Sequence, residues 1–187
     1  MSISSHPVSI RSARARDAVA VAELQTLSWR NPYRGMLSDN FLNDKLFANR
    51  SELWNRRLGS PTDNQYVIIA QHDEDVVGFA CVFGGENPKW GSLLDNLHVQ
   101  PTQRGRGIGK TLMAAIANWC SLKYQKTGLY LLVFAQNAQA RHFYERLGGK
   151  ALGEVIWIAP DGTAVNEVRY VWNNPKELTA AAKLGTA

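Results

Sequence analysis

The chain has 187 residues, 45% of them hydrophobic and 20% charged, a composition that suits one compact soluble domain and excludes a disordered chain. Its net charge of +5 could attract either nucleic acid or a polyphosphate cofactor. Nucleic-acid binding is disfavoured, because the sequence has no long basic tract interleaved with aromatic residues. Because no apolar window approaches the ~20 residues that span a membrane and no secretory signal opens the chain, we expect a cytoplasmic protein without a membrane partner.

The first part of the chain predicts a strand followed by two helical segments. Apolar residues favour a strand at 8–12, and Asp17 opens an amphipathic segment with helical spacing. Pro32 and Gly35 then break the chain before a second helical region at 38–57.

Three strands are predicted next. Residues 66–70 and 76–83 are rich in β-branched and aromatic side chains, and a polar stretch between them suits a hairpin loop. Glycines and a proline at 84–91 predict a longer loop, after which an apolar run at 93–99 predicts a third strand that ends at Pro101.

A strand, a helix and a strand follow in the centre of the sequence. The helix is predicted by apolar residues whose spacing places them on one stripe: Ile108, Leu112, Ala115, Ile116 and Trp119. It is predicted to end near Gly128. An apolar strand at 129–134 and a helix from Asn137 to about Gly148 come next. A strand-helix-strand unit favours parallel pairing of its two strands.

The last segments predict a closing hairpin and a tail. Residues 151–158 and 165–172 are the predicted strands of this hairpin, joined by a turn that contains glycine and proline. We expect one domain at 1–174 and a loose Ala-rich tail at 175–187.

The two cysteines argue against a metal or a disulfide framework. Cys81 and Cys120 lie far apart and form no Cys-x-x-Cys pair. We therefore expect two buried thiols, no zinc site and no other metal cofactor.

The central strand and its helix are joined by a run that is rich in glycine and basic residues: Gln103-Arg104-Gly105-Arg106-Gly107-Ile108-Gly109-Lys110. The free N–H groups at a helix N-terminus attract phosphate, and glycines let the backbone approach an anion closely. A plain turn does not need three glycines and three cations. The run therefore predicts a phosphate site.

Two common phosphate loops do not fit when the spacing is counted. A Walker A loop has four residues between its first glycine and its Gly-Lys pair, whereas three separate Gly105 from Gly109. A Rossmann loop requires Gly-x-Gly-x-x-Gly, whereas Gly105, Gly107 and Gly109 are spaced uniformly by two.

The pattern that does fit is Arg104-x-x-Gly107-x-Gly109, between a strand and a long amphipathic helix. It is preceded by Leu97-His98-Val99-Gln100-Pro101 and followed by Asn137-x-x-Ala140-x-x-Phe143-Tyr144-x-x-Leu147-Gly148. Over residues 93–149, this combination resembles the GCN5-related N-acetyltransferase (GNAT) family. The resemblance implies an α/β fold with a mixed, mostly antiparallel central sheet, a parallel strand-helix-strand crossover and flanking helices.

The same resemblance implies an acyl-CoA-dependent N-acetyltransferase that takes acetyl-CoA and an amine, and a possible homodimer through the terminal strands. The residues implied to contact acetyl-CoA are Leu97, His98, Val99, Arg104, Gly105, Arg106, Gly107, Ile108, Gly109, Lys110, Asn137, Ala140 and Tyr144. Main-chain groups of Leu97 and Val99 would hold the acetyl and pantetheine portions, since the family's fourth strand is splayed. Tyr144 would protonate the leaving thiolate.

The reaction also needs a base, because an amine with a pKa of roughly 10 is mostly protonated at neutral pH. Strand alternation groups Leu93, Asp95, Leu97 and Val99 on one face, and Asn96 and His98 on the other. Asp95 is the predicted base, acting through water, although a solvated or salt-bridged carboxylate is the alternative interpretation. His98 titrates in the useful range but is predicted to point away from Asp95.

The acceptor amine is not encoded in a motif. A small molecule is favoured over a peptide N-terminus or a lysine side chain, and we expect its binding residues in 31–57, 84–91 and the closing hairpin. Four aromatic residues form either an acceptor pocket or a helical core: Trp29, Tyr33, Phe41 and Trp54. A non-catalytic acyl-CoA-binding regulatory domain is the alternative function.

Overall fold

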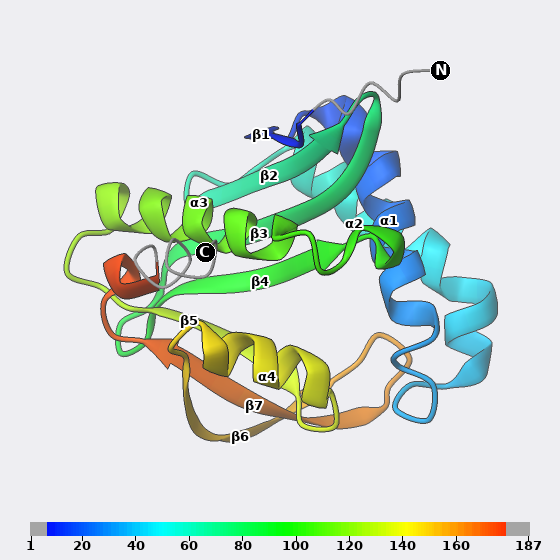
Figure 1. Ribbon diagram of the computed structural model, residues 1–187. Helices are drawn as coiled ribbons and strands as arrows, with labels where there is room; N and C mark the ends of the chain where they lie inside the picture. Colours follow the sequence, from blue (N-terminus) through cyan, green and yellow to red (C-terminus); the bar gives the residue numbers. More distant parts are fainter. Residues whose placement is uncertain (1–6, 179–187) are drawn as a thin grey trace.

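The computed structural model describes residues 7–178, which form a seven-stranded sheet with helices on both faces (Figure 1). The strands are β1 (Ser9–Ser12), β2 (Gln65–His72), β3 (Asp75–Asn87), β4 (Gly91–Val99), β5 (Leu129–Phe134), β6 (Lys150–Ile158) and β7 (Ala164–Trp172). Their order across the sheet is β1-β2-β3-β4-β5-β7-β6. Only β4 and β5 pair in parallel, so the predicted mixed, mostly antiparallel sheet is confirmed.

The helices are α1 (Ala18–Arg30), α2 (Leu46–Gly59), α3 (Ile108–Lys123) and α4 (Ala138–Arg146), with 3-10 turns at Ala15–Asp17 and Pro101–Gln103 and a π-helical turn at Phe41–Lys45. Helices α1 and α2 share a buried apolar cluster with one face of the sheet, which includes Val21, Trp54 and Phe79. Helices α3 and α4 share another cluster with the opposite face, which includes Leu112 and Tyr144. Within residues 7–178, no helix is long and apolar enough to cross a membrane.

The apolar stripe of α3 fixes this helix on the sheet. Ile108, Leu112 and Ile116 follow one another at intervals of four residues, and each is at most 4% exposed. Burying an aliphatic side chain of this size contributes about 1.5–3 kcal/mol. Because α3 packs on β3 and β4, its N-terminus is held beside the end of β4.

Strand β3 is longer than the sequence predicts. It continues through Gly84 and Gly85 to Asn87, inside the segment expected to be a loop. A Cβ atom at Gly84 would stand 2.0 Å from Cε2 of Tyr124, which follows α3. Glycine is therefore required here by the close approach of a ring and not by a turn.

The C-terminal segments complete the sheet and its core. The predicted hairpin forms, and its second strand, β7, lies between β5 and β6. Residues 175–178, at the start of the predicted tail, form a helical turn whose Leu178 is fully buried beneath α3. The rest of the predicted tail lies outside the described residues. Cys81 and Cys120 are both buried free thiols, as expected.

The two central strands separate after a short stretch of pairing. Strands β4 and β5 pair only between Ser92–Leu94 and Leu129–Leu131. Strand β4 also bulges at Asp95, because Leu94 lies opposite Val82 whereas Asn96 lies opposite Cys81. Beyond this bulge, β4 has no partner on its β5 side within the described chain, which leaves an opening in the middle of the sheet.

Candidate active site

A cavity of about 960 Å³ occupies the opening between β4 and β5 and extends between the helices of both faces. Twelve of the residues predicted to contact acetyl-CoA line it: Leu97, His98, Val99, Arg104, Gly105, Gly107, Ile108, Gly109, Lys110, Asn137, Ala140 and Tyr144. The exception is Arg106, whose guanidinium donates a hydrogen bond to the Gln103 side chain at 3.1 Å. The structure therefore brings together residues that span about a quarter of the sequence.

Six successive backbone amides at the start of α3 lack acceptors. None of the N–H groups of residues 105–110 donates a hydrogen bond to any residue within the described range 7–178. The first helical hydrogen bond runs from the Thr111 N–H to the Gly107 carbonyl at 3.0 Å. Unpaired amides at a helix N-terminus, with Arg104 and Lys110 beside them, form a site for an anion such as a pyrophosphate.

The glycines of this loop have two different functions. Gly105 and Gly107 have φ angles of +79° and +80°, a left-handed conformation that strains other residues. Gly109 is helical, and a Cβ atom there would lie 3.3 Å from Cζ of Phe143 on α4. The first two glycines therefore shape the turn, and the third allows α3 and α4 to approach each other.

The open edge of β4 presents further backbone groups to the cavity. The Gln100 N–H donates to the Val77 carbonyl on β3 at 2.8 Å. Because N–H groups alternate between the two edges of a strand, those of Leu97 and Val99 point away from β3, toward the opening. These are the positions at which the family resemblance predicts contact with the cofactor.

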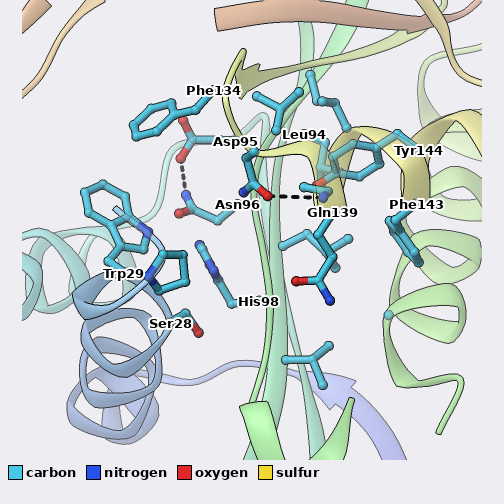
Figure 2. A pocket seen from close by; sticks show the side chains of 18 of the residues that line it. Ser28, Trp29, Leu94, Asp95, Asn96, His98, Phe134, Gln139, Phe143 and Tyr144 are labelled. Carbon is cyan, nitrogen blue, oxygen red and sulfur yellow. Dashed lines mark hydrogen bonds between the residues drawn. The ribbon is translucent and has the colours of Figure 1, made fainter. Parts of the chain in front are cut away.

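Tyr144 lies in the wall of the cavity formed by α4 (Figure 2). It is 8% exposed, and its hydroxyl has no hydrogen-bond partner among the described residues. Burial raises the pKa of the phenol well above its usual range, so the group is protonated at neutral pH. Nearby Asn137 caps α4, since its side chain accepts a hydrogen bond from the Ala140 N–H at 3.1 Å, and it also lines the cavity.

Asp95 lies on the other side of β4 from Tyr144 (Figure 2). Its carboxylate accepts a hydrogen bond from Arg57 on α2 at 2.5 Å and another from the side-chain amide of Asn96. Asn96 in turn accepts from Gln25 on α1 at 2.7 Å. The carboxylate is thus the exposed end of a polar network that joins β4 to both helices of this face.

The bulge at Asp95 makes the predicted alternation of β4 wrong. Leu94 and Leu97 both pack in the cluster beneath α3, although a regular strand would direct them to opposite faces. Asp95 is instead on the side of Asn96 and His98 (Figure 2), because the inserted residue resets the alternation.

His98 does not titrate in the range that its residue type predicts. Its ring packs against Phe79 with 5.2 Å between the ring centroids. Burial, and to a lesser extent the charges of Arg104 and Arg50, lower the pKa of the imidazole to about 3. His98 is therefore neutral at physiological pH.

Glu167 on β7 is an acidic group of the cavity that the sequence analysis did not identify. It pairs with Phe134 on β5, so the two side chains share one face of the sheet. Glu167 is 8% exposed, and its carboxyl makes no hydrogen bond or ion pair with any residue in the described part of the chain. Burial, reinforced by the charge of Asp95, raises its pKa to about 7.

Aromatic rings from α1, the segment after it, β5 and β6 also line the cavity. Trp29 and Tyr33 line it, together with Phe134 from β5 and Trp157 from β6. The centroids of Tyr33 and Phe134 are 4.4 Å apart, and those of Trp29 and Trp157 are 6.3 Å apart. The other two candidate aromatics, Phe41 and Trp54, are core residues that do not line the cavity.

Two curated proteins are similar to part of this chain. The spermine/spermidine N(1)-acetyltransferase of Bacillus subtilis (strain 168) is 27% identical over 89 residues, which are 45% of this chain and 59% of that protein. The streptothricin acetyltransferase of Streptomyces lavendulae is 33% identical over 93 residues, 48% of this chain and 47% of that protein. The chain therefore spans about half the length of the curated relatives it matches.

The fold is also that of a solved acetyltransferase. The crystal structure of the PaiA N-acetyltransferase from Thermoplasma acidophilum in complex with coenzyme A superposes with a TM-score of 0.63. The match covers 87% of this chain and 98% of that chain at 20% sequence identity. The family model described as the acetyltransferase (GNAT) family matches residues 18–149, from the start of α1 to just beyond α4. Since that match covers most of the sequence and the fold agrees with it, the chain belongs to the acetyltransferase (GNAT) family.

Proposed function

We propose that this protein transfers the acetyl group of acetyl-CoA to a primary amine by direct attack of the amine on the thioester. The observation that carries the proposal is the row of six unpaired amides at 105–110, which opens into the same cavity as the free edge of β4. Both curated relatives are named as acetyltransferases, and the similar structure from Thermoplasma acidophilum contains coenzyme A.

The amides of residues 105–110 bind the pyrophosphate of acetyl-CoA, with Arg104 and Lys110 adding positive charge. The N–H groups of Leu97 and Val99 hold the pantetheine and acetyl portions along the open edge of β4. One of these donors also stabilises the oxyanion that forms when the amine attacks the carbonyl carbon.

Two buried side chains manage the protons. Glu167 accepts a proton from the neutral amine as it attacks, for which a pKa of about 7 is well matched at neutral pH. As the C–S bond breaks, Tyr144 donates its phenolic proton to the leaving thiolate. The products are the N-acetylated amine and coenzyme A with a free thiol.

Asp95 is a weaker candidate for the base than Glu167. Its carboxylate is already engaged by Arg57 and Asn96, so it contributes by holding α2 against β4. Proton transfer through water from the acceptor to Asp95 is the second possibility, and pH profiles distinguish the two carboxylates.

The acceptor is a small amine with an apolar body. The rings of Trp29, Tyr33, Phe134 and Trp157 supply apolar contacts on the acceptor side of the cavity. The relatives are named for acceptors of different shape, spermine or spermidine in one case and streptothricin in the other.

Release of coenzyme A thiol from acetyl-CoA, measured with a panel of primary amines, tests the proposal. Amine-dependent thiol release together with mass-spectrometric detection of the acetylated amine is the expected result. Tight binding of coenzyme A without release by any amine would instead identify a non-catalytic acyl-CoA-binding domain.

A further inference from the structure

The acceptor side of the cavity contains a buried positive charge that lacks a counter-charge. The Arg50 side chain on α2 lines the cavity, and the residue is 8% exposed. Its Nε and Nη2 atoms both donate to the carboxamide oxygen of Asn49, from Nε at 3.0 Å. The third nitrogen, Nη1, makes no hydrogen bond, and no carboxylate among residues 7–178 forms an ion pair with this guanidinium.

The surrounding charges do not neutralise Arg50. Asp95 attracts it electrostatically, but the Asp95 carboxylate is already paired with Arg57, which repels Arg50. Burial lowers the pKa of Arg50 to about 10, which still leaves the guanidinium charged at neutral pH. Nη1 of Arg50 is not among the fully buried atoms that lack a partner, so it is accessible from the cavity, and an anion there would stabilise a charge whose hydration is reduced by burial.

Two more donors that line the cavity lack partners among the described residues. The guanidinium carbon of Arg50 lies 4.8 Å from the centre of the Trp29 ring. The indole N–H of Trp29 and the hydroxyl of the adjacent Ser28 are buried without a hydrogen-bond partner among the described residues, and both side chains line the cavity on the same side of β4 (Figure 2). Guanidinium and indole groups can only donate, so a ligand that satisfies them must accept.

Glu167, the acidic residue of the cavity that has no partner, lies on a different element from Arg50. Glu167 is on β7 beside Phe134, whereas Arg50 is on α2 above Trp29. The rings of Trp29, Tyr33 and Phe134 form a continuous row between these two places, with neighbouring centroids 5.1 and 4.4 Å apart. The cavity thus offers a carboxyl group for an amine, an apolar wall, and a cation for an anion.

We infer that the acceptor is a small amino acid whose reacting amine and carboxylate are separated by an apolar body, so that the carboxylate pairs with Arg50, the body packs against the aromatic row and the amine is directed to Glu167. This inference rests on the proposed acetyl transfer to an amine. A polyamine, by contrast, would bring a second positive charge to Arg50 and would be repelled.

Matched pairs of amines with and without a carboxylate test the inference. We would measure kcat/KM by thiol release for 6-aminohexanoate and pentylamine, 4-(aminomethyl)benzoate and benzylamine, and L-lysine and cadaverine, in which the carboxylate lies at the far end of the molecule from the reacting amine. The carboxylated member of the preferred pair should be about 10- to 100-fold better, as expected for a charge-assisted hydrogen bond in a buried site. Arg50→Gln should reduce this ratio to near one.

Arg56→Gln is the matched control, because Arg56 is an exposed arginine on the same helix that does not line the cavity. It should keep the wild-type ratio. A wild-type enzyme that acetylates the plain amines at least as well as their carboxylated partners would overturn the inference while leaving acetyl transfer intact. A marked loss of coenzyme A affinity in Arg50→Gln would also overturn it, because Arg50 would then belong to the donor site.

If no amine releases thiol, the proposed function fails, and binding then decides the inference. Calorimetric titration of 6-acetamidohexanoate and 4-(acetamidomethyl)benzoate into the protein loaded with coenzyme A should show binding that Arg50→Gln removes and Arg56→Gln retains. Equal binding by both variants, or no binding by the wild type, would refute the anionic subsite.

Discussion

Burial raises the pKa of both proton-carrying side chains of the cavity, with a different consequence for each. Tyr144 and Glu167 are each 8% exposed and neither side chain has a hydrogen-bond partner among residues 7–178. Burial raises both pKa values, which keeps the phenol of Tyr144 protonated and brings the carboxyl of Glu167 to about 7. One group is therefore a proton donor and the other titrates near neutrality, which is the division of work that amide formation from a thioester requires.

Replacing Tyr144 by phenylalanine tests the donor. The substitution keeps the ring that packs against Trp172 and removes only the hydroxyl. We expect kcat to fall by about 10- to 100-fold, since general acid catalysis is lost, with coenzyme A affinity nearly unchanged. Steady-state kinetics and calorimetry measure the two effects, and an unaltered kcat would leave Tyr144 with a packing role.

Replacing Glu167 by glutamine tests the base. In the wild type, log(kcat/KM) should rise more steeply with pH below about 7 than above it, since both Glu167 and the amine must lose a proton. In Glu167→Gln the change of slope near pH 7 should vanish, leaving the titration of the amine, and kcat/KM should be about 100-fold lower at pH 7.

Asp95→Asn is the comparison for this experiment. Because Asp95 is paired with Arg57 and Asn96, its substitution should preserve the change of slope, but move it to a lower pH, since the charge of Asp95 that helps to raise the pKa of Glu167 is lost. A profile that loses this feature only in Asp95→Asn would assign the base to Asp95.

The functional residues of the cavity differ in how readily they can be identified from the sequence. Tyr144 could be identified because it lies in a motif at fixed helical spacing from Asn137. Glu167 is one acid in an alternating strand and carries no motif, and Arg50 is one of several basic residues on α2. Their importance comes from burial without a partner, which depends on what other segments place around them.

At the scale of elements, the backbone conformation of the loop before α3 leaves the amides of residues 105–110 free for the proposed pyrophosphate. Gly107 has φ of +80°, and a Cβ there would meet no atom within 4 Å, so a side chain is excluded by backbone strain and not by a clash within the protein. We predict that Gly107→Val reduces coenzyme A affinity by at least about 10-fold, since strain of about 1–2 kcal/mol displaces several amides at once. Calorimetry measures this loss.

Gly153→Val is the matched control for the loop. Gly153 on β6 has φ of +71° and equally open surroundings, but does not line the cavity. This variant should lose a similar amount of stability, measured by thermal unfolding, and retain coenzyme A affinity. Equal affinity in the two variants would contradict the assignment of the loop to pyrophosphate.

Most elements could be predicted from periodicity, whereas their irregularities could not. The stripe of α3 and the apolar run of β5 follow directly from the spacing of their side chains. The continuation of β3 through Gly84 depends on the ring of Tyr124, and the bulge at Asp95 depends on register with β3. Contacts between distant segments determine these irregularities, so they cannot be predicted from the sequence of one segment alone.

At the scale of the whole molecule, the sheet consists of two parts with a narrow hydrogen-bonded junction. Strands β1 to β4 form one part and β5, β7 and β6 the other, and only Ser92–Leu94 joins them to Leu129–Leu131. The predicted α/β fold and family are confirmed. That β5, β6 and β7 all contribute residues to one cavity could not be predicted, because it depends on the order of the strands in the sheet. The homodimer through terminal strands stays a prediction.

Amide hydrogen exchange tests this arrangement. Without ligand, the amides of Leu97 and Val99 should exchange much faster than that of His98, whose N–H faces β3. Saturating coenzyme A should slow Leu97 and Val99 selectively. Equal protection of all three amides without ligand would show that the open edge of β4 is closed in solution.

Because β4 and β5 separate, the stability of the folded protein should also depend on binding of its acyl donor, acetyl-CoA. A molecule that bridges the two strands supplies contacts that a continuous sheet would have made for itself, so every bound molecule stabilises the native state by mass action. A cell depleted of acetyl-CoA and coenzyme A would then hold less of this protein in intact form, because the unbridged chain unfolds and is degraded more readily.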